Sequence, residues 1–279
     1  MSIVIRPVKT IAESRMVEDL SMRVWGAGPE SVVPDHVIIT IAKNGGVVLL
    51  ALDGEQPVGF CLGFVGFTKE LRIKHCSHQV GVLSAYQNSG LGYQLKVVQR
   101  QMVLGQGIDH VTWTFDPLGS RNANLNLHKL GAVCRTYLPN LYGQIRDSLN
   151  KGLPTDRFQV DWWVKSEWVG SRVDSTPSLP TLSEWEARGV RLLNAPTRNR
   201  EGYLVPAMNL PSLEKQYYLV ELPSNIEAIK SADLSLAYAW RMHTRAVFEK
   251  AFAQGYSAID LLYERGRSCY LLEKDWENR

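Results

Sequence analysis

Three strand-like runs follow one another closely in the first third of the chain, and they constrain the fold more than any other feature. The runs cover residues 47–52, 57–67 and 71–83 and are rich in apolar and aromatic residues. Only short links separate them, such as the turn Asp53-Gly54-Glu55. Short links join antiparallel neighbours, because parallel strands need a crossover of about a dozen residues or more. We therefore predict an antiparallel meander.

Helical and strand patterns surround the meander. Apolar residues recur at helical spacing in 11–25, and Pro34 opens a second helical candidate that ends at Lys43. After the meander, 90–106 is an amphipathic helix that Gly105 and Gly107 end. The remaining candidates in this half are strands at 2–8, 108–115, 132–138 and 158–164, and a short helix at about 122–130.

The composition changes after residue 168. Residues 170–186 are rich in Ser, Thr and Pro and are typical of a linker. We therefore expect two domains, 1–168 and 169–279. The second has strand candidates at 189–194, 203–208, 217–222, 257–263 and 268–273, and a long helix from Asp233 to Gln254.

Two stretches of the chain resemble each other. "LGYQLKVVQR" begins at Leu91 and "LAYAWRMHTR" begins at Leu236, and each lies between two strand candidates. Either the chain carries a degenerate duplication or two amphipathic helices are alike by chance. The turn before the first helix holds two glycines, and the turn at 231–237 holds none. We expect that whatever the first turn binds, the second does not.

The first turn, "YQNSGLGY" at 86–93, joins the third strand run to the helix. A helix start leaves backbone N–H groups without partners and carries partial positive charge, which suits phosphate. Glycine permits close approach to the backbone, although a simple tight turn also explains it. The third glycine of a dinucleotide fingerprint is replaced by Leu95, and the Gly-Lys-Ser/Thr of a Walker loop is absent. The pattern present is Gln87-x-x-Gly90-x-Gly92.

This pattern resembles the signature of the GNAT superfamily, the Gcn5-related acyl-CoA N-acyltransferases. The stretch "TFDPLGSRNANLNLHKLGA" (114–132) is similar to the second motif of that family, and the string through 137–143 resembles a subgroup of predicted acetyltransferases. The resemblance implies an α/β (α+β) fold with a mixed, mostly antiparallel central sheet flanked by helices. The second half would then be a degenerate GNAT-like unit.

The resemblance also implies where acyl-CoA lies. Acetyl-CoA, or another acyl-CoA, would occupy a split between the fourth strand (about 71–83) and the fifth (about 108–115). Backbone of Val82 and Leu83 would bond the pantetheine arm and polarise the thioester carbonyl. Asn122 and Asn126 would contact the far side of the arm, or would serve only as a helix cap and a solvated face. The pyrophosphate cradle would be Gln87, Asn88, Ser89, Gly90, Leu91, Gly92 and Tyr93.

An attacking amine must lose a proton, and His78 is the candidate base. A histidine at the matching position resembles the proton-relay group of arylalkylamine N-acetyltransferases, although a structural histidine is the alternative. Period-two alternation predicts His78, Val80 and Val82 on one face and His75 on the other.

The leaving thiolate needs a proton, and many members of the family supply it from a tyrosine. Leu127 occupies that position here, so Tyr137 or Tyr142 would substitute, or the thiolate would leave without help. Both tyrosines also have a structural reading. The acceptor pocket is expected near Trp25, the 26–34 loop and 137–142. Trp162 or Trp163 would border it, and Arg23 or Arg135 would bind a carboxylate.

Composition narrows the function class. The net charge of +3 is modest and argues against nucleic-acid binding. The four cysteines lack CxxC spacing, so no metal site is predicted, and a reducing cytoplasmic location is expected. A signal-peptide pattern and a membrane-spanning apolar run are not found in the sequence.

We predict an N-acyltransferase, with acetyl the default acyl group, that moves the acyl group to a small-molecule amine or amino acid in a ternary complex. A homodimer is one arrangement that the second half would allow. The alternative is a non-catalytic CoA-binding regulatory or structural module.

Overall fold

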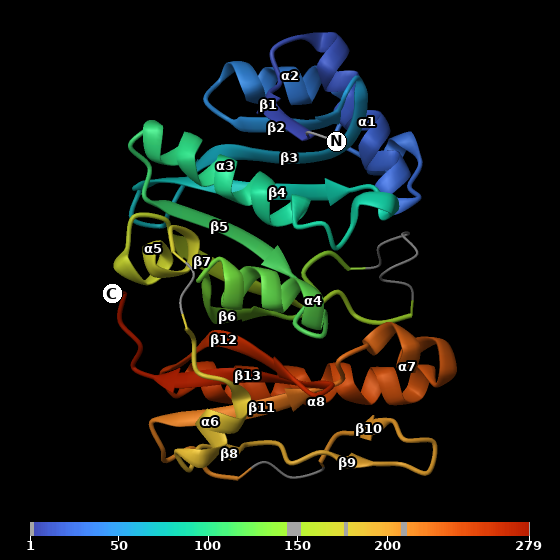
Figure 1. Cartoon of the computed structure of the whole chain (residues 1–279). Helices are drawn as coiled ribbons and strands as arrows, with labels where there is room; N and C mark the ends of the chain where they lie inside the picture. Colours follow the sequence, from blue (N-terminus) through green and yellow to red (C-terminus); the bar gives the residue numbers. More distant parts are fainter. Residues whose placement is uncertain (1–2, 144–151, 176–177, 208–210, 279) are drawn as a thin grey trace. The chain divides into compact units, whose positions relative to one another are not determined.

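The computed structural model describes residues 3–143, 152–175, 178–207 and 211–278 (Figure 1). The chain divides into two compact units. Unit 1 consists of the described residues up to Trp113 together with 163–165, and unit 2 consists of the other described residues. The two expected domains, 1–168 and 169–279, were drawn from the change in composition, and they stay a prediction.

The predicted meander is confirmed in unit 1. Strands β1 to β4 pair as antiparallel neighbours in chain order, and β4 pairs with β5 in parallel. The mixed, mostly antiparallel sheet flanked by helices that the sequence predicts is therefore present. The strands are β1 (Ile3–Pro7), β2 (Val47–Asp53), β3 (Gln56–Phe67), β4 (Ile73–Val82) and β5 (His110–Phe115).

Helices cover both faces of the unit 1 sheet. Thr10 and Glu13 form a capping box that begins α1 (Ile11–Trp25), and Pro34 is the N-cap of α2 (Asp35–Lys43). Buried residues of these two helices pack against β2 and β3 in one core cluster. The opposite face carries α3 (Leu91–Gly105), whose Leu91 side chain would lie 3.3 Å from a Cβ at Gly59. Two short 3₁₀ helices, η1 (Pro29–Ser31) and η2 (Ser84–Tyr86), complete this unit.

Unit 2 contains the rest of the strands. Its sheet has the order β7-β6-β12-β13-β11-β8, and a separate hairpin pairs β9 with β10. The neighbours are antiparallel except for β11 and β8. The strands are β6 (Val133–Leu138), β7 (Arg157–Trp163), β8 (Arg191–Leu192), β9 (Thr197–Arg198), β10 (Leu204–Val205), β11 (Tyr217–Leu222), β12 (Tyr256–Glu264) and β13 (Arg267–Lys274).

The prediction of a linker at 170–186 is wrong at both ends of this range, where the structure has helices. Helix α5 (Glu167–Val173) extends into it and α6 (Leu182–Ala187) lies at its end, while residues 176–177 fall outside the described residues. Ser166 caps the first helix, and Thr181 forms a capping box with Glu184 at the second. Ser and Thr are favoured both in linkers and at helix starts, so composition alone could not separate the two.

The long helix that the repeat predicts is confirmed as α8 (Leu234–Ala253), which follows α7 (Ile226–Ala232). Both copies have a strand, a helix and another strand in the same order. Their sheets differ, because β4 and β5 are direct neighbours whereas β13 lies between β11 and β12. The likeness is therefore one of element order, and the duplication itself stays a prediction.

Candidate functional site

A β-bulge interrupts β4 at His78. Gln79 pairs with Leu62, but Ser77 pairs with Gly63, so β4 has one residue more than β3 at this point. A bulge of this kind shifts the alternation of side chains and bends the strand that carries it. The bulge therefore redirects His78.

The prediction that His78, Val80 and Val82 share one face of the sheet is wrong because of this bulge. Val80 pairs with Cys61, and Val82 pairs with Gly59, which α3 covers. The side chains of Val80 and Val82 therefore lie on the α3 side of the sheet. The imidazole of His78 lies beside the ring of Phe64 instead, with 6.1 Å between the ring centroids. Simple period-two counting cannot detect an inserted residue.

The surroundings of His78 suit a proton acceptor. The residue is exposed, yet the protein atoms near its ring lower the pKa of the imidazole below its ordinary value by desolvation. A lowered pKa keeps the ring neutral near neutral pH, and only the neutral ring accepts a proton. His75 lies on the α3 side together with Val80 and Val82, whereas regular alternation predicted it on the opposite face from them, and burial lowers its pKa to about 4.

The edge of β4 that faces away from β3 is paired with β5 over a short stretch. The described pairs are His75 with Val111 and Cys76 with Thr112. Beyond these two pairs, the described residues of β4 have no pairing with β5 on this side. We call the backbone of residues 77–83 on this side the open edge of β4.

Val82 directs its peptide groups toward the open edge. The N–H of Leu83 donates to Val58 O at 3.0 Å on β3, and neighbouring residues of a strand point their peptide groups to opposite sides. The side chain of Gln87 donates from Nε2 to Val82 O at 3.3 Å. Gln87 therefore ties the strand end to the turn.

The turn that follows ends in a helix start without a capping side chain. Asn88 and Gly90 have φ of 65° and 86°, and Gly90 is the N-cap of α3. A Cβ at Gly90 would meet no protein atom within 4 Å. The first N–H groups of α3 therefore begin at an exposed residue in open space, which suits an anion.

The equivalent helix start in unit 2 is capped by its own side chain. Asp233 precedes α8, and its Oδ1 accepts from the N–H of Leu236 at 2.9 Å. A carboxylate therefore occupies the place where an external anion would bind. The expectation that the second turn does not bind what the first binds stays a prediction.

Asp233→Ala is expected to lower the free energy of unfolding by about 1 kcal/mol through loss of the cap. CoA affinity should not change, because we place no ligand at α8. Urea unfolding and a CoA titration measure the two effects. A loss of CoA affinity at unchanged stability would contradict the assignment of the anion site to α3 alone.

The short helix predicted at 122–130 is partly a π-helix. It begins as α4 (Ser120–Ala123) and continues as the π-helix η3 (Asn124–Lys129). Asn122 is exposed, whereas Asn126 is buried and its carbonyl accepts from Ala132 N at 2.9 Å. Leu127, at the position of the family's tyrosine, is completely buried. The wide π turn was not detectable from helical periodicity.

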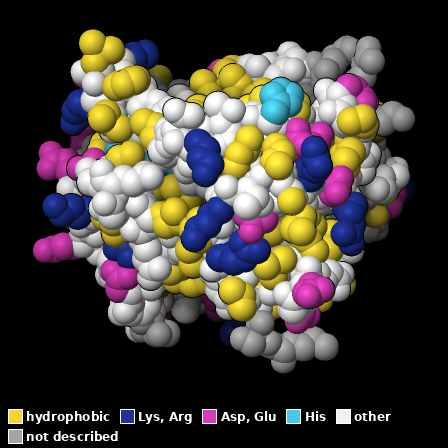
Figure 2. Space-filling view, turned by 90° about the horizontal axis from the view of Figure 1, so that it is seen from above, with side chains coloured by type: hydrophobic (Ala, Val, Ile, Leu, Met, Phe, Trp, Pro, Cys, Tyr) yellow, Lys and Arg dark blue, Asp and Glu magenta, His cyan; other side chains and the backbone are white. Residues whose placement is uncertain are grey.

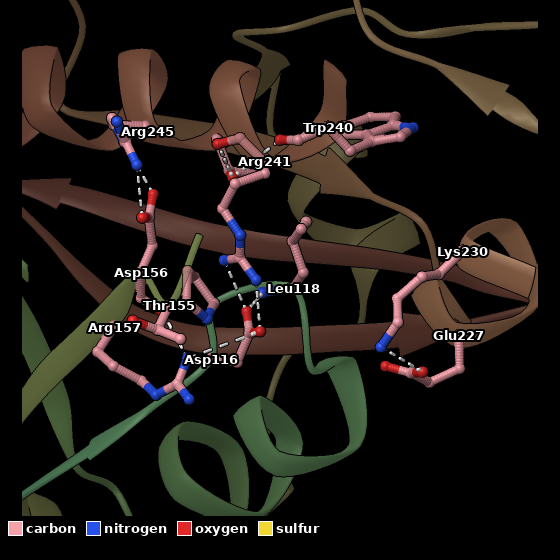
Figure 3. A network of polar contacts seen from close by, with 12 residues as sticks. Asp116, Leu118, Thr155, Asp156, Arg157, Glu227, Lys230, Trp240, Arg241 and Arg245 are labelled. Atoms are coloured by element: carbon pink, nitrogen blue, oxygen red, sulfur yellow. Dashed lines mark hydrogen bonds and ion pairs between the residues drawn. The ribbon is translucent and has the colours of Figure 1, made fainter. Parts of the chain in front are cut away.

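Tyr137 donates its hydroxyl proton to a buried carboxylate. Its OH lies 2.7 Å from Asp156 Oδ2, and Arg245 holds the same carboxylate at 2.6 and 2.9 Å (Figure 3). Burial and this hydrogen bond raise the pKa of Tyr137. Tyr142 differs, because it is exposed and its OH lies 2.8 Å from Thr114 Oγ1. Of the two, Tyr142 has the more accessible proton.

A second arginine of α8 makes a matching ion pair. Arg241 contacts both carboxylate oxygens of Asp116, at 2.8 and 2.5 Å (Figure 3). Sequence reasoning missed both arginine pairs, because their partners lie more than 80 positions apart along the chain. One signal existed, since Arg241 and Arg245 coincide in the repeat with Lys96 and Arg100.

The aromatic residues and arginines proposed for the acceptor pocket have the following neighbours. In unit 1, Trp25 packs edge-on against Phe60 at 5.5 Å, and Trp163 stacks on His110 at 4.1 Å. In unit 2, Trp162 is buried and donates to Leu130 O, and the guanidinium of Arg135 lies 5.8 Å from the Trp276 ring centroid. Arg23 lies in the last turn of α1.

The described residues show no feature that indicates binding of nucleic acid, a metal ion or a membrane. On the face shown in Figure 2, Lys and Arg side chains are interspersed with acidic and apolar ones. No three His, Cys, Asp or Glu side chains of the described ranges come together in a way that could hold a metal ion. Among the helices that the structure describes, none has the length and apolar character needed to cross a bilayer.

Comparison with known proteins gives matches only among solved structures. No protein-family model and no curated protein matches the sequence. A GNAT-family acetyltransferase from Streptococcus pneumoniae matches with 14% identity and a TM-score of 0.47, over 57% of this chain and 98% of that one. Another matching structure is that of a putative acetyltransferase of the GNAT family from Desulfovibrio desulfuricans.

Two further matches carry more specific names. The ribosomal-protein-S18-alanine N-acetyltransferase from Escherichia coli has 14% identity and a TM-score of 0.46, over 58% of this chain and 94% of that one. Naa50 from Arabidopsis thaliana, solved with the bisubstrate analogue CoA-Ac-MVNAL, has 16% identity and a TM-score of 0.46, over 58% of this chain and 98% of that one. At these identities and TM-scores, the likeness assigns no activity or substrate to this chain.

Proposed function

We propose that the chain is an acyl-CoA-dependent N-acyltransferase whose CoA site lies in unit 1. One observation carries the proposal: the open edge of β4 leads directly into an uncapped, glycine-started α3. The pyrophosphate of CoA fits the first N–H groups of α3, and the pantetheine arm fits the peptide groups that Val82 turns outward. An arm that runs back along β4 brings the thioester toward the bulge at His78.

The proposed reaction is direct transfer. His78 takes a proton from the acceptor ammonium, and the amine nitrogen attacks the thioester carbonyl. A C–N bond forms, the C–S bond breaks, and backbone N–H groups of β4 stabilise the charge on the carbonyl oxygen. The CoA thiolate leaves and takes up the second proton of the attacking nitrogen, directly or through water, so that the amide and the free thiol of CoA result. The acceptor that we propose is a small-molecule amine or an amino acid.

Thiol release from acetyl-CoA in the presence of a panel of small amines and amino acids tests the activity. We expect release that depends on both substrates. CoA binding without release for any amine would instead favour a non-catalytic CoA-binding module. The buried Leu127 favours that alternative, because it stands where many family members carry a tyrosine acid.

His78→Ala is expected to lower kcat near neutral pH about a hundredfold, as loss of a general base does. In the wild type, kcat should fall as the pH drops through the lowered pKa of His78, because the protonated ring cannot accept a proton. The variant should lack this limb and keep its CoA affinity. A pH–rate profile measures the limb and a CoA titration measures the affinity, with the exposed His36→Ala as control. An unchanged profile in His78→Ala would exclude it as the base.

A further inference from the structure

A buried lysine lies where β4 and β5 stop pairing. Lys96 projects from α3, is 2% exposed, and donates from Nζ to Ser77 Oγ at 3.0 Å. The same Nζ lies 3.7 Å from the ring centroid of Trp113 on β5. Lys96 therefore contacts both strands from one side of the sheet.

The position of these contacts is specific. The parallel ladder pairs Cys76 with Thr112, so the next pair in register would be Ser77 with Trp113. These are the two residues that Lys96 contacts. We call this point, defined by Ser77 and Trp113, the fork. The residue after Ser77 is the bulged His78.

Further polar contacts form a chain beneath the fork. Gln99 Oε1 accepts from Lys96 Nζ at 2.7 Å and from Ser77 Oγ at 3.0 Å. Gln99 Nε2 donates to His75 Nε2 at 3.2 Å when that ring nitrogen is the unprotonated one. The Ser77–Gln99–His75 contacts do not involve Lys96, so they would persist without its ammonium group.

The fork is an unfavourable place for a cation. Burial lowers the pKa of Lys96 to about 8, which means that the folded chain disfavours its charged form. A buried polar group of this kind lowers stability unless its contacts compensate for desolvation, and residues with such a cost are common at functional sites. A methionine of similar length would fill the same space without the charge.

We propose that Lys96 is a positioning residue that holds β4 and β5 apart at the fork, and so keeps the open edge of β4 accessible to the pantetheine arm of acyl-CoA. The inference rests on the proposed function. Without the ammonium group, β4 and β5 can pair one position further, at Ser77 and Trp113. That extra pair narrows the entrance for the arm but leaves the pyrophosphate turn at 87–93 unchanged.

The experiment compares two ligands by calorimetry. Acetyl-CoA carries the pantetheine arm, whereas the nucleotide half of CoA carries the pyrophosphate and the adenosine without the arm. Lys96→Met should bind acetyl-CoA about tenfold more weakly and the nucleotide half as tightly as the wild type does. Its urea midpoint should equal or exceed that of the wild type. The exposed Lys69→Met serves as the matched control and should change neither affinity.

The outcomes separate the two claims. Equal acetyl-CoA affinity in Lys96→Met and wild type, or an equal loss for both ligands, overturns the role of Lys96 while the proposed function stands. Failure of the wild type to bind either ligand overturns the proposed function and the role of Lys96 with it. Should Lys96→Met not fold, Ser77→Ala provides the second test, because it removes the contact on β4. It should weaken acetyl-CoA binding alone, and unchanged binding would contradict the proposal.

Discussion

Gly90→Glu is expected to weaken CoA binding about a hundredfold, which corresponds to about 2.7 kcal/mol. The new carboxylate would lie at the start of α3, where it would repel the pyrophosphate and bind the N–H groups that the pyrophosphate would use. Asp233 already caps α8 in this way. Calorimetric titration with CoA measures the loss.

Two control variants separate charge from strain. Gly90 has a φ of 86°, so any side chain there strains the backbone. Gly90→Gln has the size and strain of the glutamate without its charge, and it should bind CoA more tightly than Gly90→Glu. Gly105→Glu places the same charge at the far end of α3, where a Cβ meets no atom within 4 Å. Equal affinities for Gly90→Glu and the wild type would refute the site.

Asp156→Asn is expected to lower the free energy of unfolding by about 3 kcal/mol. The side chain of Asp156 is fully buried and accepts hydrogen bonds from Arg245 and Tyr137, so neutralising it leaves Arg245 without its counter-charge. Although burial acts to raise it, these hydrogen bonds lower the pKa of Asp156 below its ordinary value. Urea unfolding monitored by circular dichroism measures the change.

The pH dependence gives this prediction a second test. A carboxyl whose pKa is lowered by folding stabilises the protein fully above its unfolded pKa of about 3.9. That contribution is lost as the pH falls through the folded pKa, so wild type and variant should converge in acid. Glu227→Gln breaks the exposed pair with Lys230 in the same view, and it should cost at most about 0.5 kcal/mol (Figure 3). Equal losses in the two variants would contradict the argument.

The sequence predicted most elements because their local signals agreed. The meander, α1, α3 and α8 each combined clear periodicity with glycine, proline or capping residues at their ends. The linker expected at 170–186 failed where capping serines and threonines were read as linker composition. Local composition identifies residues that favour a turn, but it does not show whether a helix begins after them.

The candidate site was predicted less completely, because its details depend on distant contacts. The turn at 86–93 was identifiable from its glycines and from the strand before it. The bulge at His78 depends on the register between β3 and β4, and the residue pattern of β4 alone does not indicate it. The pairing of Tyr137 with Asp156 and Arg245 likewise joins three separate segments. Contacts of this kind become visible only in the folded chain.

A crystal structure of the chain with acetyl-CoA would test the central claim most directly. We expect pyrophosphate oxygens within hydrogen-bond distance of the first N–H groups of α3, and the pantetheine arm beside the peptide groups of Val82. A pyrophosphate bound elsewhere, with the start of α3 facing only water, would contradict the claim.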